Sequence, residues 1–329
     1  MGAIAACQKL TPKNHNIVAD RDDLLNCQYR NTPVNTRALT SFRQNSSRLA
    51  PMNPKMMLTP TVLSRLAAAL GGAALLALLL RGWSAGTQLL VASSVLMFLA
   101  CLASAARVLG PRPAICLVLI ALPIGWFAEE MGANYGWFFG SYDYTPVLGP
   151  QLGSVPVVIP LMWFALSYIG YVMANLIVWQ VPADGATSIR RSLVMALLAA
   201  LIVTAYDLGV DPYMVYKLKA WIMVKHDGWW FGETLQGFAG WMLVACSIVL
   251  VFRLLLRRTG ARPAPSARTR DVLVPLGLYG ALMLFEATQG VPVETRTVAL
   301  FVMGMPLFCA ACGLYRWQLL PALAVGSAA

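Results

Sequence analysis

Residues 192–209 read SLVMALLAALIVTAYDLG, an apolar run that carries one carboxylate, Asp207, close to its end. An α-helix needs about 20 mainly apolar residues to cross a bilayer, with a range of roughly 17–25. This run has that length, and its aspartate falls where the hydrocarbon region would end. The stretch therefore predicts a membrane-spanning helix that places an acidic side chain near the membrane boundary.

Apolar runs of this kind recur along the chain and predict an all-α, polytopic membrane helical bundle of about eight transmembrane helices. The predicted spans are 62–80, 88–106, 113–131, 155–178, 192–209, 235–256, 272–289 and 297–315. The number is seven if the first span, which contains Arg65 and Gly71-Gly72, does not cross. We expect a transmembrane domain over 61–317 and a C-terminal tail over 318–329. The polar segment 1–60 is predicted to be disordered, or to reflect a start codon placed too far upstream.

The composition excludes several classes of protein. Hydrophobic residues make up 58% of the chain and charged residues 12%, whereas soluble domains have about 45–50% and 25%. This composition rules out a soluble enzyme. A nucleic-acid-binding protein is also ruled out, because the basic residues behind the net charge of +11 flank apolar runs. The two histidines, His15 and His226, are too few for a histidine-rich di-iron membrane hydroxylase.

The basic residues in the loops predict an orientation typical of a bacterial inner membrane protein. If the N-terminus is cytoplasmic, nine loop Arg and Lys residues fall on the inner side and five on the outer side. Because cytoplasmic loops are enriched in Arg and Lys, both termini are predicted to be cytoplasmic.

Acidic residues are distributed even more unevenly. Nine of the eleven acids after position 60 fall at the predicted outer ends: Glu129, Glu130, Asp143, Asp207, Asp211, Asp227, Glu233, Glu286 and Glu294. Acidic residues contribute little to topology, so orientation does not explain this pattern. We therefore expect a functional site at the outer face.

Aromatic residues accompany these acids. Of 33 aromatic residues, 17 lie within 126–144 and 206–241. One interpretation is a shared aromatic-lined pocket, and the other is the ordinary belt of Trp and Tyr at a membrane interface.

Four of the acids, Glu129, Glu130, Asp207 and Glu286, directly follow apolar runs. An ionisable group at that depth is costly and by default marks a functional site. A desolvated carboxyl group can hold a proton near neutral pH and deliver it. The alternative is that these acids pair with Lys217, Lys219 or Arg296, or cap helix ends.

Asp207 and Asp211 have the DxxxD spacing that prenyltransferases use to hold Mg²⁺ and diphosphate. Pro212 is expected to push Asp211 out of helical geometry, so that Asp211-Pro212 begins a turn. The chain also has no companion Asp/Asn-rich motif, and we predict no metal site.

Two blocks of residues resemble the membrane carotenoid hydratases, which include the gamma-carotene 1′,2′-hydratases and the bisanhydrobacterioruberin hydratases. The first block comprises Ala128-Glu129, Gly132, Gly136, Phe139-Gly140, Tyr142, Tyr144, Leu148-Gly149, Val155-Pro156, Ile159-Pro160 and Trp163. The second comprises Asp207, Asp211-Pro212, Met214, Trp221, Gly228, Phe231-Gly232, Phe238 and Gly240-Trp241. The likeness spans roughly 60–316. Glu233-Thr234, Gly237 and Met223 depart from the family pattern.

The resemblance implies an enzyme that adds water to the terminal C=C bond of an acyclic carotenoid end, without a cofactor. We expect Asp207 to be the acid that protonates the alkene and Glu129 to be its base, with Glu130 and Asp211 as the next candidates. The predicted substrate-binding residues are Trp137, Tyr142, Tyr144, Trp163, Trp221, Trp230, Phe231, Trp241 and Glu286. The polyene is expected to enter laterally from the lipid bilayer.

Two other classes remain open. One is a different acid-initiated isoprenoid enzyme, such as a cyclase or a Mg²⁺-dependent prenyltransferase. The other is a non-catalytic membrane carrier or lipid-binding protein, which would leave the mass of every carotenoid unchanged. No oligomeric state is predicted.

Overall fold

The computed structural model describes residues 59–82, 86–184, 188–225, 227–259 and 267–326. The predicted N-terminal extension therefore lies outside the described residues, apart from Thr59 and Pro60, and so do both histidines.

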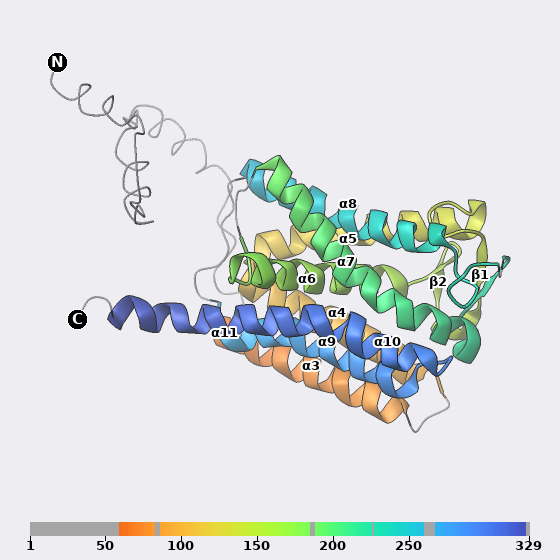
Figure 1. Ribbon diagram of the computed structural model, residues 1–329, viewed down its shortest axis with the longest axis horizontal. Coiled ribbons are helices and arrows are strands. Elements are labelled where there is room, and N and C mark those ends of the chain that lie inside the picture. The colour runs from red at the N-terminus through yellow and green to blue at the C-terminus, as the bar shows by residue number, and fades with distance from the viewer. Residues whose placement is uncertain (1–58, 83–85, 185–187, 226, 260–266, 327–329) are drawn as a thin grey trace, which may run out of the picture. The chain divides into compact units, whose positions relative to one another are not determined.

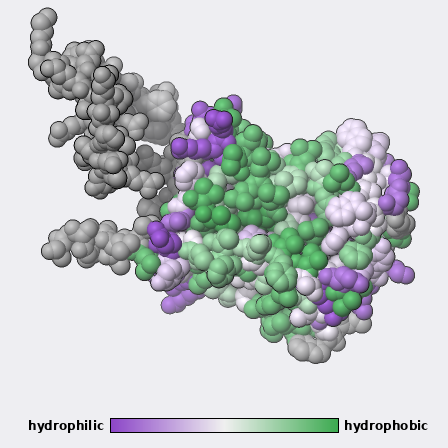
Figure 2. Space-filling model, viewed as in Figure 1, coloured by the Kyte–Doolittle hydropathy of each residue, from purple (hydrophilic) through white to green (hydrophobic). Residues whose placement is uncertain are grey.

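Long helices dominate this part of the chain, and eight spans are long and apolar enough to cross a membrane. The helices are α3 (Pro60–Arg81), α4 (Gln88–Val108), α5 (Pro111–Tyr135), α6 (Val158–Trp179), α7 (Ile189–Pro212), α8 (Leu235–Thr259), α9 (Thr269–Gln289), α10 (Glu294–Val302) and α11 (Gly304–Gly326). Large apolar side chains such as Leu119, Leu201 and Phe308 are exposed, as lipid contact requires. Hydrophobic side chains occupy much of the visible face of the helical part (Figure 2). The predicted polytopic all-α membrane bundle is confirmed.

The last predicted span consists of two helices. α10 ends at Val302, and α11 begins at Gly304 and continues to Gly326, through most of the range predicted as a tail. Pro306 explains the break, because proline has no N–H to donate to the carbonyl of Val302 four residues earlier.

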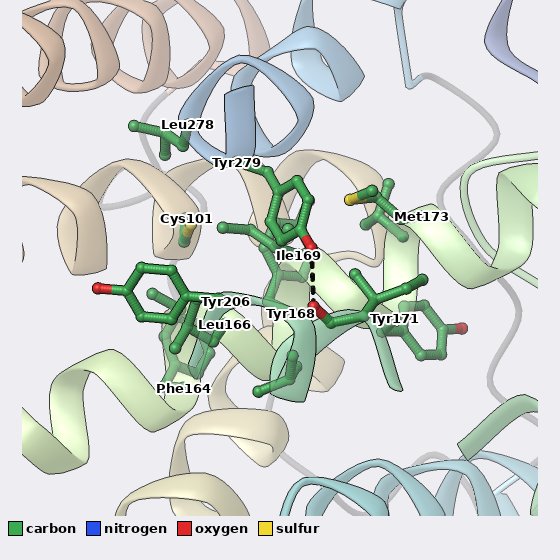
Figure 3. Close-up of a cluster of buried hydrophobic side chains, with 14 of the residues drawn as sticks. Cys101, Phe164, Leu166, Tyr168, Ile169, Tyr171, Met173, Tyr206, Leu278 and Tyr279 are labelled. Carbon is green, nitrogen blue, oxygen red and sulfur yellow. Dashed lines mark hydrogen bonds between the residues drawn. The ribbon is translucent and has the colours of Figure 1, made fainter. Parts of the chain in front are cut away.

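α6 lies within the bundle and supplies much of its core, including Phe164, Tyr168 and Tyr171. Figure 3 shows these side chains with Tyr206 of α7 and Tyr279 of α9. The Tyr279 hydroxyl donates to the backbone carbonyl of Ile202 at 2.8 Å, which satisfies its polar atom inside the core (Figure 3).

Two buried arginines form ion pairs, and the first of these lies near the N-termini of α3 and α9. Arg107 lies 3.4 Å from Asp271, and Arg253 lies 3.5 Å from Asp184. These contacts involve the two acids that the sequence places apart from the other nine.

Short strands cover the other end of the bundle, which we call the site end (Figure 1). In the α5–α6 connection, β1 (Tyr142–Tyr144) is followed by a 3₁₀ turn (Pro146–Leu148), β2 (Gln151–Leu152) and β3 (Val155–Pro156). The α7–α8 connection contains a π-helical turn, η4 (Tyr213–Leu218), and β4 (Trp221–Met223). β2 pairs with β3, and β1 pairs antiparallel with β4. The β1–β4 pairing joins the two aromatic-rich segments that are far apart in the sequence.

Candidate functional site

A cavity of about 80 Å³ lies at the site end, between the two aromatic-rich segments. Three carboxylates line it, from Glu129, Asp211 and Glu233. Its aromatic walls come from Phe139, Tyr142, Tyr144, Trp163, Tyr206, Trp221 and Trp241. Apolar walls with a few convergent polar groups are typical of small-molecule sites.

The geometry of β1 explains how part of this wall is formed. Tyr142 and Tyr144 are two residues apart in β1, so both side chains point to the same face, while Asp143 between them is exposed. Tyr144 is paired with Trp221 of β4, and their rings meet edge to face with centroids 5.8 Å apart. The ribbon therefore presents three aromatic side chains to the cavity.

Glu129 of α5 is held by three hydrogen-bond donors. Its Oε2 accepts from the Tyr142 hydroxyl at 2.5 Å and from the Tyr144 hydroxyl at 2.8 Å. Its Oε1 accepts from the Trp163 indole N–H at 2.8 Å. Hydrogen bonds to a carboxylate favour the charged form, so these donors offset part of the cost of burying an ionised Glu129.

Two glycines on α5 let these donors approach. Gly125 lies one turn before Glu129, and a Cβ atom there would come within 2.7 Å of the Trp163 ring. Gly132 lies three residues after Glu129, and a Cβ atom there would meet the Tyr142 hydroxyl at 2.9 Å. The face of α5 that carries Glu129 therefore accommodates both rings because it lacks side chains at these positions.

The two tyrosines remain donors over the physiological range. Burial is the main cause that raises the pKa of Tyr142 and Tyr144 well above the ordinary phenol value, and the charge of Glu129 adds to it.

Asp207, Asp211 and Glu233 form a second carboxylate group, which we call the acid cluster. One oxygen from each lies within 4.8 Å of the others, and the residues are 0%, 6% and 3% exposed. Asp211 accepts from the Trp221 indole N–H at 2.9 Å. Among the described residues, no N–H or hydroxyl group donates to either oxygen of Asp207. The acid cluster thus differs from Glu129 in having few donors, and its spacing would fit protons shared among the acids or one cation.

The prediction that Asp211-Pro212 begins a turn is wrong, because α7 continues through Pro212. Proline at 212 leaves the carbonyl of Leu208 without its usual helical donor. The Trp230 indole N–H donates to that carbonyl at 3.0 Å and takes the place of the missing amide. Asp207 and Asp211 consequently remain one helical turn apart on the same face of α7.

Glu233 reaches the acid cluster from a tight turn before α8. Gly228 pairs with Gly232, and Trp230 pairs with Glu233, in isolated antiparallel bridges. Phe231 and Gly232 both have positive φ, 49° and 89°, which reverses the chain over a few residues. The sequence showed Glu233 as an outer acid and as a departure from the family pattern, but nothing in it indicated an inward direction.

Burial raises the pKa of Glu233, and the neighbouring Asp207 and Asp211 raise it further, to about 12. This shift favours the neutral form of Glu233.

Several predicted site residues lie outside the cavity. Glu130 accepts from the Ser154 backbone N–H at 2.9 Å and from the Asn134 side-chain amide at 3.0 Å, which ties α5 to the β2–β3 turn. Trp137 is 54% exposed. Glu286 of α9 is buried against Gly209 of α7.

Trp230 and Phe231 also lie outside the residues that line the cavity. Trp230 contacts the backbone of α7, as described above, and the carbonyl of Phe231 accepts from the Tyr216 hydroxyl at 2.7 Å. The structure brings together the other predicted residues, Glu129, Asp211, Tyr142, Tyr144, Trp163, Trp221 and Trp241, and Asp207 joins them through the acid cluster.

Comparison with known proteins identifies the family. A family model described as "Carotenoid biosynthesis protein" matches residues 86–310, which is more than half of the chain. The chain belongs to this family. The resemblance found in the two motif blocks is thereby confirmed at the level of the family.

Two curated proteins are similar to parts of this chain. A bisanhydrobacterioruberin hydratase of Haloarcula japonica is 30% identical over 185 residues, which cover 54% of this chain and 58% of the relative. A Na⁺/H⁺ antiporter NhaA of Pseudomonas fluorescens is 30% identical over 200 residues, which cover 58% of this chain and 47% of the relative. The chain thus spans about half the length of both relatives. No solved structure matches it.

Proposed function

We propose that the protein is a carotenoid hydratase, which adds water to the terminal C=C bond of an acyclic carotenoid end. Family membership and the similarity to a bisanhydrobacterioruberin hydratase support this proposal. The observation that carries it is one aromatic cavity that Glu129 lines directly and that the acid cluster, to which Asp207 belongs, borders through Asp211 and Glu233. Glu129 accepts hydrogen bonds from three donors, whereas no N–H or hydroxyl group in the described part of the chain donates to Asp207.

Asp207 is the acid in this proposal. An ionised carboxylate that is buried without a donor is costly, so a neutral acid suits its surroundings. It transfers its proton to the less substituted carbon of the terminal double bond, and the tertiary carbon becomes the cation.

The aromatic rings and Glu129 face that cation. Rings such as Trp163 and Trp241, whose centroids are 4.6 Å apart, attract a cation by about 0.5–2 kcal/mol each. Water adds to the tertiary carbon, and Glu129 takes the proton that the attacking water loses. The net reaction consumes one water and gives a tertiary alcohol.

The membrane setting fits the two substrates. The polyene is proposed to enter from the bilayer, whose lipid also surrounds the exposed apolar faces of the helices. Water is proposed to come from the outer face, where the nine clustered acids are expected to lie, with both termini in the cytoplasm.

A second candidate function is proton-coupled transport, and the similarity to an antiporter favours it. Buried carboxylates that exchange protons could serve either activity. The mass of the carotenoid product distinguishes the two, because transport leaves it unchanged.

The test is expression in a host that accumulates acyclic carotenoids, with product masses measured by liquid chromatography and mass spectrometry. The wild-type protein is expected to add the mass of one water. Asp207→Asn and Glu129→Gln are each expected to lower the amount of hydrated product at least about 100-fold, since general acid–base catalysis contributes about 10²–10⁴-fold.

Asp143→Asn is the matched control, because this carboxylate lies on β1 but is exposed on its outer face. It is expected to keep wild-type activity. Unchanged carotenoid masses in the wild type, or full activity in both site variants at equal protein levels, would refute the hydratase proposal.

A further inference from the structure

The acid cluster contains two carboxyl groups that the proposed mechanism does not use, those of Asp211 and Glu233. Glu233 comes from the turn before α8, whereas Asp207 and Asp211 come from α7. We propose that Glu233 is a positioning residue that holds a proton and donates a hydrogen bond to Asp207, so that the cluster acts as one acid. The role assigned to this hydrogen bond rests on the proposed function.

Geometry places these groups in mutual reach. One carboxylate oxygen from each residue lies within 4.8 Å of the others, and all three residues are buried. The Glu233 side chain is also confined, since a Cβ atom at Gly237 would meet its Oε1 at 2.6 Å. A residue with a side chain at 237 would displace Glu233 from this position.

Few hydrogen-bond donors reach the carboxylate oxygens of the acid cluster. Asp211 accepts a hydrogen bond from the Trp221 indole N–H, but within the residues that the structure describes no N–H or hydroxyl group donates to either oxygen of Asp207 or to Oε2 of Glu233. Three buried anions at this spacing would repel one another. Protons carried by the acids themselves relieve that repulsion and supply the missing donors, and the raised pKa of Glu233 agrees with this.

A retained proton on Glu233 has a defined effect on the reaction. When Asp207 gives its proton to the alkene, it becomes a buried carboxylate. The Glu233 O–H donates to this carboxylate without transferring its proton, which stabilises the new anion and makes Asp207 a stronger acid. The proton accepted by Glu129 must return to Asp207 before the next turnover, so Glu233 is unchanged at the end.

Infrared spectroscopy of the purified full-length protein in detergent tests the protonation state directly. Neutral carboxylic acids have a C=O stretch separate from that of carboxylates, and the band shifts in D₂O. Glu233→Gln is expected to remove one such band at neutral pH, while Glu130→Gln, outside the cavity, is expected to leave the bands of the cluster unchanged. Asp211→Asn should shift the Glu233 band, and it provides the same test if Glu233→Gln does not fold.

Reaction rates test the role of the hydrogen bond. Glu233→Met removes the donor and is expected to lower kcat at least about tenfold with little change in KM, because one hydrogen bond to a charged group is lost. Glu233→Gln keeps an N–H donor and is expected to retain more activity than Glu233→Met. If the role of Glu233 were purely structural, Glu233→Gln and Glu233→Met variants of equal stability would have equal activity.

Three results would overturn the inference. One is an unchanged infrared spectrum in Glu233→Gln. Another is one tightly bound divalent cation per chain, found by elemental analysis of the wild type and lost in Glu233→Gln, since a cation would hold the carboxylates ionised. The third is equal activity of both Glu233 variants and the wild type. If the wild type shows the Glu233 band but hydrates no carotenoid, the shared proton stands and the proposed function fails.

Discussion

The environments of individual carboxylates distinguish their roles better than their positions in the sequence do. Glu129 and Glu130 are adjacent, but only Glu129 faces the cavity and three aromatic donors, while Glu130 holds a turn. The sequence identified both because the two follow the same apolar run. It could not separate them, because the direction of each side chain depends on where β1 and the β2–β3 turn dock.

Glu233 gives a prediction about stability and pH. Its folded-state pKa is raised to about 12, whereas an unfolded glutamate titrates near about 4.3. Between these values the unfolded chain is ionised and the folded chain holds the proton, so stability from this group is full below about pH 4.3 and falls as the pH rises.

Glu233→Gln removes this dependence. The melting temperature of the variant relative to the wild type is expected to increase steadily from pH 5 to pH 8, as measured by thermal denaturation in detergent. The slope from a single group is at most about 1.4 kcal/mol per pH unit. Glu130→Gln, measured in parallel, is the control for a general loss of charge, and a difference between Glu233→Gln and wild type that does not vary with pH would contradict the prediction.

At the scale of elements, the apolar runs were sufficient to predict the helices that span the membrane. The prediction was wrong at the end of α7, because Pro212 suggested a turn but the helix continues through it. The compensation comes from Trp230, which lies 18 residues further along and donates to the freed carbonyl of Leu208. Local sequence does not contain this information, since it depends on how the α7–α8 connection folds back.

This arrangement predicts a coupling between Trp230 and Pro212. Trp230→Phe is expected to lower the free energy of unfolding by about 1 kcal/mol, because it leaves a partly buried carbonyl without a donor. In a Pro212→Ala background the alanine N–H can bond to Leu208, so the same change is expected to cost less. A double-mutant cycle on denaturation in detergent measures this difference, and strictly additive effects would show that Trp230 does not replace the missing amide.

At the scale of the whole molecule, composition identified the class, and the distribution of acids pointed to the end of the bundle that holds the aromatic cavity. Three of the nine acids, Glu129, Asp211 and Glu233, line one cavity together with residues from both aromatic-rich segments. The contribution of the short β1–β4 ribbon was not foreseen, because its two three-residue strands are too short to be recognised among aromatic loop residues.

Orientation in the membrane is the prediction that belongs to this scale. With nine loop cations on one side and five on the other, both termini are expected to be cytoplasmic. A green fluorescent protein fused after Ala329 should therefore fluoresce, and alkaline phosphatase at the same position should be inactive. The reverse pair of results would place the acid cluster on the cytoplasmic side.

The β1–β4 ribbon also sets a rule for engineering this scaffold. Tyr142 and Tyr144 bond to Glu129 from one connection, while their strand partners, Met223 and Trp221, belong to the other. If only one connection were taken from a homologue, its strand would no longer match the strand of the other connection, and the β1–β4 pairing would be misaligned. The two connections therefore act as one structural unit, and chimeras intended to change the proposed polyene substrate should carry both together.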